Sequence, residues 1–153
     1  MTETEYIAYK RANFSTRLDS KRLYTAGHFW VAQHEEHDDS VWRVGFTKFA
    51  TRMLGEPVEF DIEVEPKEEL TVGQVIGWIE GFKAVTDLFC PLNGRYAGAN
   101  PELDDAITLI QTDPYGRGWL YALEASPGDG CLSLQEYTAV LDATIDKMMG
   151  RDE

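Results

Sequence analysis

Cysteine and long apolar runs are scarce in this sequence, and their absence excludes several classes of protein. Cys90 and Cys131 are the only two cysteines, and neither belongs to a C-x-x-C motif. Two isolated cysteines do not provide a disulfide framework, so we expect free, reduced thiols. No apolar run approaches the roughly 20 residues of a membrane-spanning helix, and residues 1–14 lack the apolar segment of an export signal. The sequence therefore predicts a soluble cytoplasmic protein.

The sequence also contains few positively charged residues. The chain has 14 lysine and arginine residues against 27 aspartate and glutamate residues, which gives a formal net charge of −13. Because phosphate groups attract basic surfaces, we expect neither nucleic acid nor an anionic membrane as a partner. With 153 residues, of which 43% are hydrophobic, the chain is long enough for one domain with a packed core.

The few basic residues are unevenly distributed along the chain. The first 23 residues contain five of them, namely Lys10, Arg11, Arg17, Lys21 and Arg22. This shift in composition predicts an N-terminal extension over residues 1–23 and a single domain over residues 24–150. We interpret the extension as a loosely held tail, and an arm that docks a partner is the alternative.

Most of the remaining chain has the pattern of short strands. Apolar runs, or runs that alternate apolar and polar residues, are bounded by glycine, proline and asparagine turns. The predicted strands are residues 28–33, 40–46, 57–64, 72–80, 84–90, 95–99 and 119–124. The first two flank a short polar loop, which predicts a hairpin.

Three segments have helical signals. Thr47 and Gly55 have the residue types that begin and end a helix, so we expect one over residues 48–54. Asn100 followed by proline predicts a helical turn. Ser133 and Glu136 form a capping box before the apolar face of a final helix. We expect that face to contain Leu134, Tyr137, Val140, Leu141, Ile145 and Met148. Together these elements predict a strand-rich sandwich with small helices and a C-terminal helix.

Histidine and cysteine offer two weak candidate sites. His34 and His37 lie among four acidic residues, which suggests a metal ion, but their spacing is not H-E-x-x-H and a solvated turn explains them better. Cys90 has no activating neighbour in the sequence, so we expect a buried thiol. We find no Ser-His-Asp arrangement and no G-x-S-x-G motif. A hydrolytic enzyme that uses these histidines stays a minor alternative.

Lys83 is the more informative residue, because it stands between two predicted strands. Only Gly81, Phe82 and Lys83 separate residues 72–80 from 84–90. Glycine supplies the freedom that a tight reversal needs. A lysine at such a turn is most often a solubilising charge, but a turn also presents one amine rigidly, as a modifying enzyme requires.

The residues around Lys83 resemble a family motif. Glu80, Lys83-Ala84, Asp87, Pro91 and Gly94 resemble the lipoylation hairpin of H proteins, the lipoyl carriers of the glycine cleavage system, whose pattern is E-S-[VI]-K-A-x-x-D-[IL]-x-x-P-x-x-G. Similarity also covers Tyr24-Thr25, His28-x-Trp30-Val31, Val44-Gly45-x-Thr47-x-x-Ala50, Leu54-Gly55, Asn100-x-x-Leu103 and residues 113–120, within residues 24–145 overall.

This resemblance implies a fold, a cofactor and a set of partners. The fold would be a mainly β lipoyl domain, a barrel-sandwich hybrid of short antiparallel strands. Lys83 would carry lipoate as N6-lipoyllysine, and Glu80, Gly81, Phe82 and Gly94 would be read by the attaching enzyme. The chain would be a carrier rather than an enzyme. Its partners would include a lipoate ligase or lipoyl transferase and dihydrolipoamide dehydrogenase.

Departures from the motif suggest a particular branch of the family. Gly81 replaces the usual serine, Phe82 replaces a small β-branched residue, and Cys90 begins a changed C-P-L-N-G segment. These changes resemble lipoate-binding proteins of the heterodisulfide-reductase-like sulfur-oxidising complex, so we take a shuttle of sulfur intermediates or reducing equivalents for that complex as the first hypothesis. The alternatives are an H protein that serves glycine decarboxylase and aminomethyltransferase, and an unmodified binding module.

Overall fold

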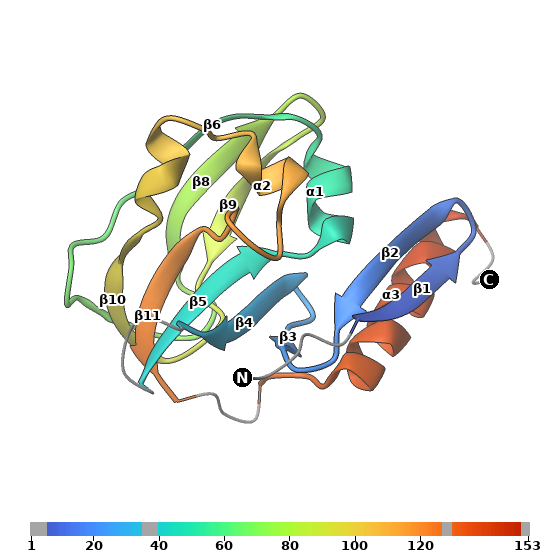
Figure 1. Ribbon diagram of the computed structural model, residues 1–153, viewed down its shortest axis with the longest axis horizontal. Coiled ribbons are helices and arrows are strands. Elements are labelled where there is room, and N and C mark those ends of the chain that lie inside the picture. Colours follow the sequence, from blue (N-terminus) through green and yellow to red (C-terminus); the bar gives the residue numbers. More distant parts are fainter. Residues whose placement is uncertain (1–5, 35–39, 127–129, 151–153) are drawn as a thin grey trace.

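The computed structural model describes residues 6–34, 40–126 and 130–150, and most of their regular structure is β. Figure 1 shows two main parts. A body of curved sheets occupies one side, and a two-stranded hairpin with the C-terminal helix occupies the other. Both ends of the described chain lie on the hairpin side.

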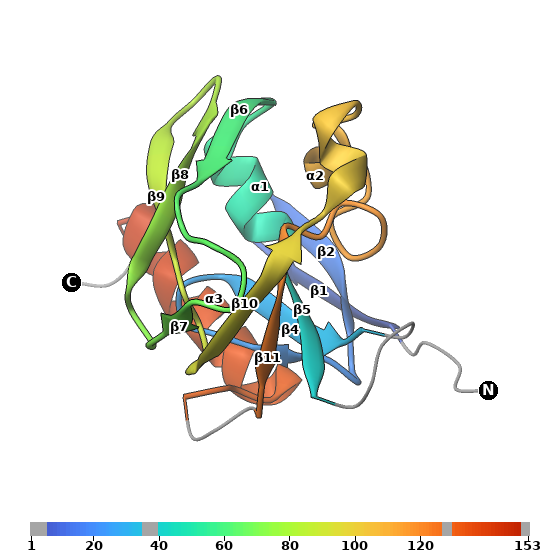
Figure 2. The ribbon, with the colours of Figure 1, turned by 90° about the vertical axis from the view of Figure 1, so that its left-hand side faces the viewer.

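The body contains two antiparallel sheets that face one another (Figure 2). In the described residues the larger sheet has the order β3 (Leu23–Tyr24), β4 (Phe29–Gln33), β5 (Val41–Phe46), β11 (Tyr121–Ala125), β10 (Gly94–Ala99) and β7 (Glu69–Leu70). The smaller sheet has the order β6 (Pro57–Ile62), β8 (Val75–Gly81) and β9 (Val85–Phe89). Each of the strands predicted from alternation is confirmed, with bounds that differ by a few residues.

The core lies between these sheets. Val31 and Val44 of the larger sheet pack in one cluster with Ile79 and Leu88 of the smaller sheet, and all four side chains are fully buried. Because successive residues of a strand point to opposite faces, each sheet gives one apolar face to this cluster. For β6, the alternation also predicted the solvent-facing side, because Glu59 and Asp61 are exposed while Phe60 and Ile62 are partly buried.

The described residues form four helices. The body includes α1 (Lys48–Leu54), the 3₁₀ helix η1 (Pro101–Asp104) and α2 (Leu109–Thr112), whereas α3 (Leu134–Met148) lies with the N-terminal hairpin (Figure 1). The Thr47 side chain accepts from the Ala50 N–H, and the Ser133 and Glu136 capping box is formed. The predicted caps are thus confirmed. Met148 is 57% exposed, so the buried face of α3 ends at Ile145 rather than in the last turn.

The expectation of a loosely held N-terminal tail is wrong for the described part of this segment. β1 (Tyr6–Arg11) and β2 (Phe14–Asp19) pair as an antiparallel hairpin. Phe14 meets the ring of Phe49 on α1 edge-on at 5.4 Å, and Leu18 is fully buried. A two-stranded hairpin is stable only when another element covers one face, and here that cover comes from residues far away in the sequence.

Helix α3 covers that face of the hairpin. The Tyr9 hydroxyl donates to the Asp142 carboxylate at 2.7 Å, and the Arg11 guanidinium donates to Asp146 at 2.8 Å. Arg11, one of the basic residues that distinguish this segment in the sequence, thus pairs with the acidic face of α3. The division between residues 1–23 and 24–150 stays a prediction.

None of the helices in the described ranges has the length and apolar character that crossing a bilayer requires.

Replacing Leu18 with alanine tests whether the hairpin belongs to the cooperative fold. We expect the free energy of unfolding to fall by about 2–4 kcal/mol, because a fully buried leucine leaves a cavity. Urea denaturation measures this change. The control is Val72→Ala, at a side chain that is 57% exposed, which should change stability by less than about 0.5 kcal/mol. Equal small effects of both substitutions would show that the hairpin folds independently of the body.

Candidate functional site

Lys83 lies in the turn that joins β8 to β9. Glu80 pairs with Val85 across the two strands, and the Gly81 N–H donates to the Ala84 carbonyl at 2.8 Å. Phe82, Lys83 and Ala84 therefore form the tip, and all three are exposed. Figure 2 shows this turn extending past the rest of the small sheet. The predicted placement of the lysine between two paired strands is confirmed.

The end of α1 holds the tip by two backbone hydrogen bonds. The Lys83 N–H donates to the Leu54 carbonyl at 2.9 Å, and the Phe82 N–H donates to the Glu56 carbonyl at 3.0 Å. Strand pairing alone fixes only the base of a hairpin. These two bonds also fix the tip, so the side chain of Lys83 leaves from a rigid backbone. Sequence reasoning missed this support, because it comes from a segment almost 30 positions earlier.

The amine of Lys83 is accessible. Its Nζ donates to the Arg52 carbonyl at 3.1 Å, in the last turn of α1. A helix leaves its last carbonyl groups without intrahelical donors and favours positive charge there. One exposed hydrogen bond of this kind contributes only about 1 kcal/mol, so it orients the amine without burying it.

Two glycines allow the tip to approach α1 closely. A Cβ atom at Gly81 would lie 2.4 Å from the Leu54 carbonyl oxygen, and one at Gly55 would lie 2.9 Å from Cγ of Lys83. Gly55 also has a φ of +80°, which L residues with a side chain rarely adopt. Gly81 has no positive φ, so the expected reason for glycine there is wrong. The contact with Leu54, rather than the turn conformation, requires the missing side chain.

Gly94 lies apart from the tip. It begins β10, at the opposite end of the β8–β9 hairpin, and pairs with Ala125 and Leu70. A Cβ atom there would lie 2.4 Å from the Glu124 carbonyl oxygen, and Gly94 is not among the residues with positive φ. Gly94 therefore packs closely against β11 and is not part of the tip.

Glu80 and Phe82 are exposed beside the lysine. Glu80 stands directly opposite Glu59 of β6, and like charges in such a pair destabilise a sheet. The Phe82 side chain is 76% exposed, although burial of a phenylalanine would stabilise the fold by roughly 1.5–3 kcal/mol. Neither placement stabilises the isolated protein. Exposed residues of this kind are typical of a surface that a partner recognises.

An apolar hollow of about 420 Å³ begins beside the tip. Its wall contains Met53 of α1 together with Val85 and Phe89 of β9. His28 also lines it, and its Nδ1 lies 2.9 Å from the Tyr137 hydroxyl. Burial lowers the pKa of His28 to about 4, so the imidazole is neutral at pH 7.

The other sequence candidates do not form a site. His34 is buried, with its ring against the edge of Trp119, and His37 lies outside the described residues. No group of three or more potential metal-ligating His, Cys, Asp or Glu residues occurs in the described ranges. Cys90 is buried as expected. Burial raises the pKa of its thiol, which donates to the Leu92 carbonyl.

Comparisons with known proteins point to one family. The sequence model for the glycine cleavage H-protein matches residues 22–146. The glycine cleavage system H protein of Magnetococcus marinus is 36% identical, over 82% of this chain and 88% of that protein. The one from Kocuria rhizophila is 37% identical, over 83% of this chain and 99% of that protein.

A solved structure supports the same conclusion. The crystal structure of a glycine cleavage system H protein from Mycobacterium marinum superposes with a TM-score of 0.72 at 32% sequence identity. The superposition covers 82% of this chain and 99% of that one. The expected H-protein-like fold is thus confirmed. The β1–β2 hairpin lies before the residues that the family model matches.

Replacing Gly81 with alanine tests the close contact between the tip and α1. We expect the free energy of unfolding to fall by about 1–3 kcal/mol, because the new methyl group must displace the Leu54 carbonyl. Gly130→Ala is the matched control, since a Cβ atom there meets nothing within 4 Å and should change stability by less than about 0.5 kcal/mol. Urea denaturation of the two variants compares them. An unchanged stability of Gly81→Ala would mean that the tip does not rest on α1.

Proposed function

Because the chain belongs to the glycine cleavage H-protein family, we propose that it is a lipoyl carrier whose attachment residue is Lys83. H proteins of this family are carrier subunits, not enzymes, and they bear lipoate covalently on a lysine. The single observation that supports Lys83 is its place at the exposed, backbone-anchored tip of the β8–β9 hairpin.

The surroundings of Lys83 fit this cofactor. Among the described lysines, Lys83 alone occupies the turn between two paired strands. Its side chain is exposed, and among the described residues its Nζ donates to the Arg52 carbonyl, so a modifying enzyme can reach it. Attachment converts the amine to an amide and removes its charge. Lipoate, when attached, supplies a dithiolane that interconverts with a dithiol and carries a group or reducing equivalents between enzymes.

The apolar hollow beside the tip gives the protein a second role besides attachment. Its wall begins at Ala84, the residue after the lysine, and is mostly apolar. An acyl chain is apolar too, so contact with Met53, Val85 and Phe89 removes surface from water at roughly 25 cal/mol for each Å². The chain thereby offers a resting surface that keeps an attached arm next to the tip between partners.

We propose glycine cleavage as the pathway. The relatives named above are glycine cleavage system H proteins, and this chain covers 88–99% of their length. Its partners would then be glycine decarboxylase, aminomethyltransferase and dihydrolipoamide dehydrogenase, with a lipoate ligase or lipoyl transferase for attachment. The comparisons lend no support to the sulfur-oxidation hypothesis that the sequence analysis put first.

Sulfur oxidation with a heterodisulfide-reductase-like complex is the second candidate, and one observation favours it. Phe82 is 76% exposed next to Lys83, at the point where a partner's active site must close around the arm. A large aromatic there changes the surface that a glycine-cleavage enzyme would meet. The two candidates share the carrier chemistry and differ only in the partner.

Lys83→Arg tests the attachment residue. We expect no lipoylation of this variant by a lipoate ligase, because the guanidinium group is not acylated, and an unchanged fold, because the side chain is exposed. Intact mass spectrometry measures the modification. Lys48→Arg is the control and should be lipoylated as fully as the parent protein. Lipoate found on another lysine of the Lys83→Arg protein would show that the attachment residue was wrongly assigned.

Glycine decarboxylation with bicarbonate exchange tests the pathway. At equal lipoylation we expect a kcat/KM within about threefold of that of an ordinary H protein. Phe82→Val, which restores a small β-branched residue, should change it little, as should the control Val72→Ala, at a side chain that is 57% exposed and does not line the hollow. One result would reject glycine cleavage in favour of the second candidate. It is a kcat/KM at least tenfold lower than that of the ordinary H protein, about 1.4 kcal/mol of lost transition-state binding, together with its recovery in Phe82→Val.

A further inference from the structure

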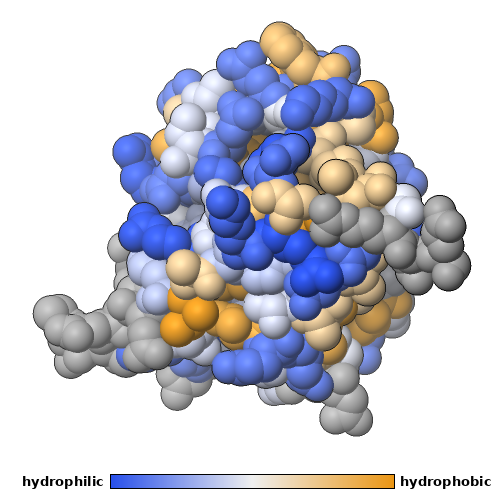
Figure 3. Space-filling view, turned by 90° about the vertical axis from the view of Figure 1, so that its right-hand side faces the viewer, coloured by the Kyte–Doolittle hydropathy of each residue, from blue (hydrophilic) through white to orange (hydrophobic). Residues whose placement is uncertain are grey.

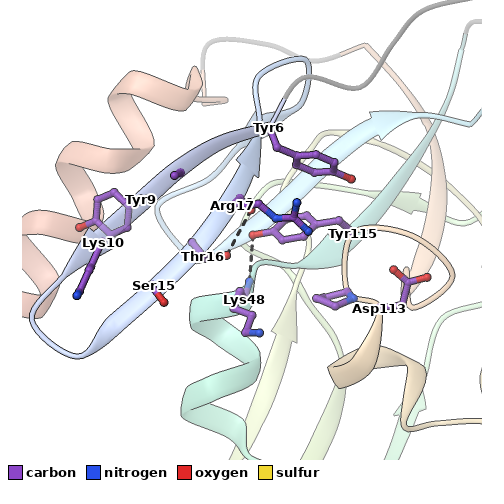
Figure 4. Close-up of a pocket in the computed structure, with 11 residues that line it drawn as sticks. Tyr6, Tyr9, Lys10, Ser15, Thr16, Arg17, Lys48, Asp113 and Tyr115 are labelled. Carbon is purple, nitrogen blue, oxygen red and sulfur yellow. Dashed lines mark hydrogen bonds between the residues drawn. The ribbon is translucent and has the colours of Figure 1, made fainter.

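An open groove of about 670 Å³ separates the β1–β2 hairpin from the body of the protein (Figure 4). One wall is the hairpin, with Lys10 and Arg17. The other contains Lys48, the first residue of α1, and the loop from Asp113 to Tyr115. The hairpin lies before residues 22–146, which the family model matches, so this groove is not built from family-matched residues alone.

Contacts between the hairpin and α1 hold the two walls together. The Phe14 ring on β2 meets the Phe49 ring on α1 at 5.4 Å, and the Arg52 guanidinium donates to the Asn13 carbonyl at 3.1 Å. On the body wall, the Tyr115 hydroxyl accepts from the Lys48 N–H at 3.1 Å (Figure 4). The basic side chains therefore stand on an ordered backbone and not on a free tail.

The basic residues of this groove lack acidic partners. Lys10, Arg17 and Lys48 form no ion pair with another described residue. Elsewhere in the described ranges, the arginines that form ion pairs with carboxylates include Arg11, Arg22, Arg95 and Arg117. Asp113 also lines the groove, but its carboxylate accepts from the Arg117 N–H of its own loop at 2.9 Å. The groove thus brings together three cations without acidic partners, in a chain with 27 acidic residues.

The placement of these cations works against the stability of the isolated protein. Lys48 begins α1, whose first turn has no acidic residue, and a positive charge at a helix N-terminus is unfavourable. Lys10 faces Ser15 and Arg17 faces Ala8, so the two cations are diagonal neighbours on one face of the hairpin. A bound anion would reverse both effects. Within the described residues the Arg17 guanidinium lies over the Tyr6 ring, 5.2 Å from its centroid, whereas Lys10 and Lys48 have neither an ion pair nor an aromatic contact there.

The groove continues toward the β8–β9 tip. A second hollow, of about 350 Å³, is lined by Lys48, Arg52, Phe82 and Lys83, so Lys48 belongs to both. The Arg52 guanidinium donates to the Asn13 carbonyl in the hairpin turn at 3.1 Å. Figure 3 shows this side of the molecule as mainly hydrophilic, with scattered apolar patches. A partner that reaches the tip along this side meets the groove as well.

We propose that the groove defined by Lys10, Arg17 and Lys48 is a docking surface for a carboxylate-rich segment of a partner enzyme. The groove is open and its cations are spread over the hairpin and α1, which fits an extended peptide with several acidic side chains. A polyphosphate such as nucleic acid would meet the same net charge of −13 as an acidic peptide, so the experiment below compares the two ligands directly. One part of this proposal rests on the proposed function, namely that the partner is an enzyme that acts at Lys83.

Binding of an octaglutamate peptide tests this surface without using lipoate. The protein is ¹⁵N-labelled Lys83→Gln, which cannot be lipoylated and has the neutral side chain that an amide would give. At low salt we expect the largest amide shifts at Lys10, Thr16 and Lys48, and a binding that weakens as salt is added. Because no arm is present, the result stands whether or not the proposed function is correct.

Two triple variants of the Lys83→Gln protein distinguish binding at a specific site from general attraction between opposite charges. Lys10→Gln, Arg17→Gln and Lys48→Gln together should weaken the affinity at least tenfold. The control changes net charge equally at exposed positions outside the groove, with Lys67→Gln, Arg95→Gln and Lys147→Gln, and should stay within twofold. Thermal unfolding checks that both triple variants fold. If one of them does not fold, the amide shifts measured in the Lys83→Gln protein still test the site, because its groove is unaltered.

Three results would overturn the proposal. The first is an absence of shifts at the groove. The second is an equal loss of affinity in the two triple variants, which would mean attraction by net charge alone. The third is tenfold tighter binding of an eight-residue oligothymidylate at the same residues, which would identify a phosphate ligand in place of an acidic peptide.

Discussion

The two backbone hydrogen bonds between the end of α1 and the β8–β9 tip are the constraint on which the site depends. The Leu54 and Glu56 carbonyls accept from the N–H groups of Lys83 and Phe82. Without them the tip would be tied only by strand pairing at its base, and the origin of the lysine side chain would vary. A carrier needs a mobile arm on a fixed origin, because the reach of the arm determines the effective concentration of its end at each partner.

The same helix also connects the tip to the N-terminal hairpin. The carbonyl of Arg52 accepts from Nζ of Lys83, while its guanidinium donates to the Asn13 carbonyl and lies over the ring of Phe14 at 5.7 Å. At the other end of α1, the Lys48 N–H is bound to Tyr115. A helix of only two turns is marginal by itself and takes its stability from tertiary contacts. Here those contacts come from the hairpin on one side and the tip on the other.

Local patterns in the sequence predicted the parts of the fold that depend on neighbouring residues. Apolar and alternating runs predicted the longer strands of both sheets but not the two-residue strands β3 and β7. Thr47, Gly55, Ser133 and Glu136 predicted the ends of α1 and the start of α3. Lys83 could be placed in a turn for the same reason. The N-terminal hairpin was missed because its stability comes from α1 and α3, which no nearby residue reveals. The support of the tip by Leu54 was missed because it too is a long-range contact.

Glycine at position 81 illustrates how a long-range contact changes the meaning of a residue. From the sequence it signals a flexible reversal, but its φ is ordinary and its need for glycine comes from the Leu54 carbonyl, 2.4 Å from where a Cβ atom would be. A serine, as in the family pattern, would have to displace that carbonyl. Phe82 lines one hollow together with Gly55 and Glu56 at the end of α1, and its side chain is 76% exposed. A partner that fits this tip must therefore accommodate the ring and the helix end together.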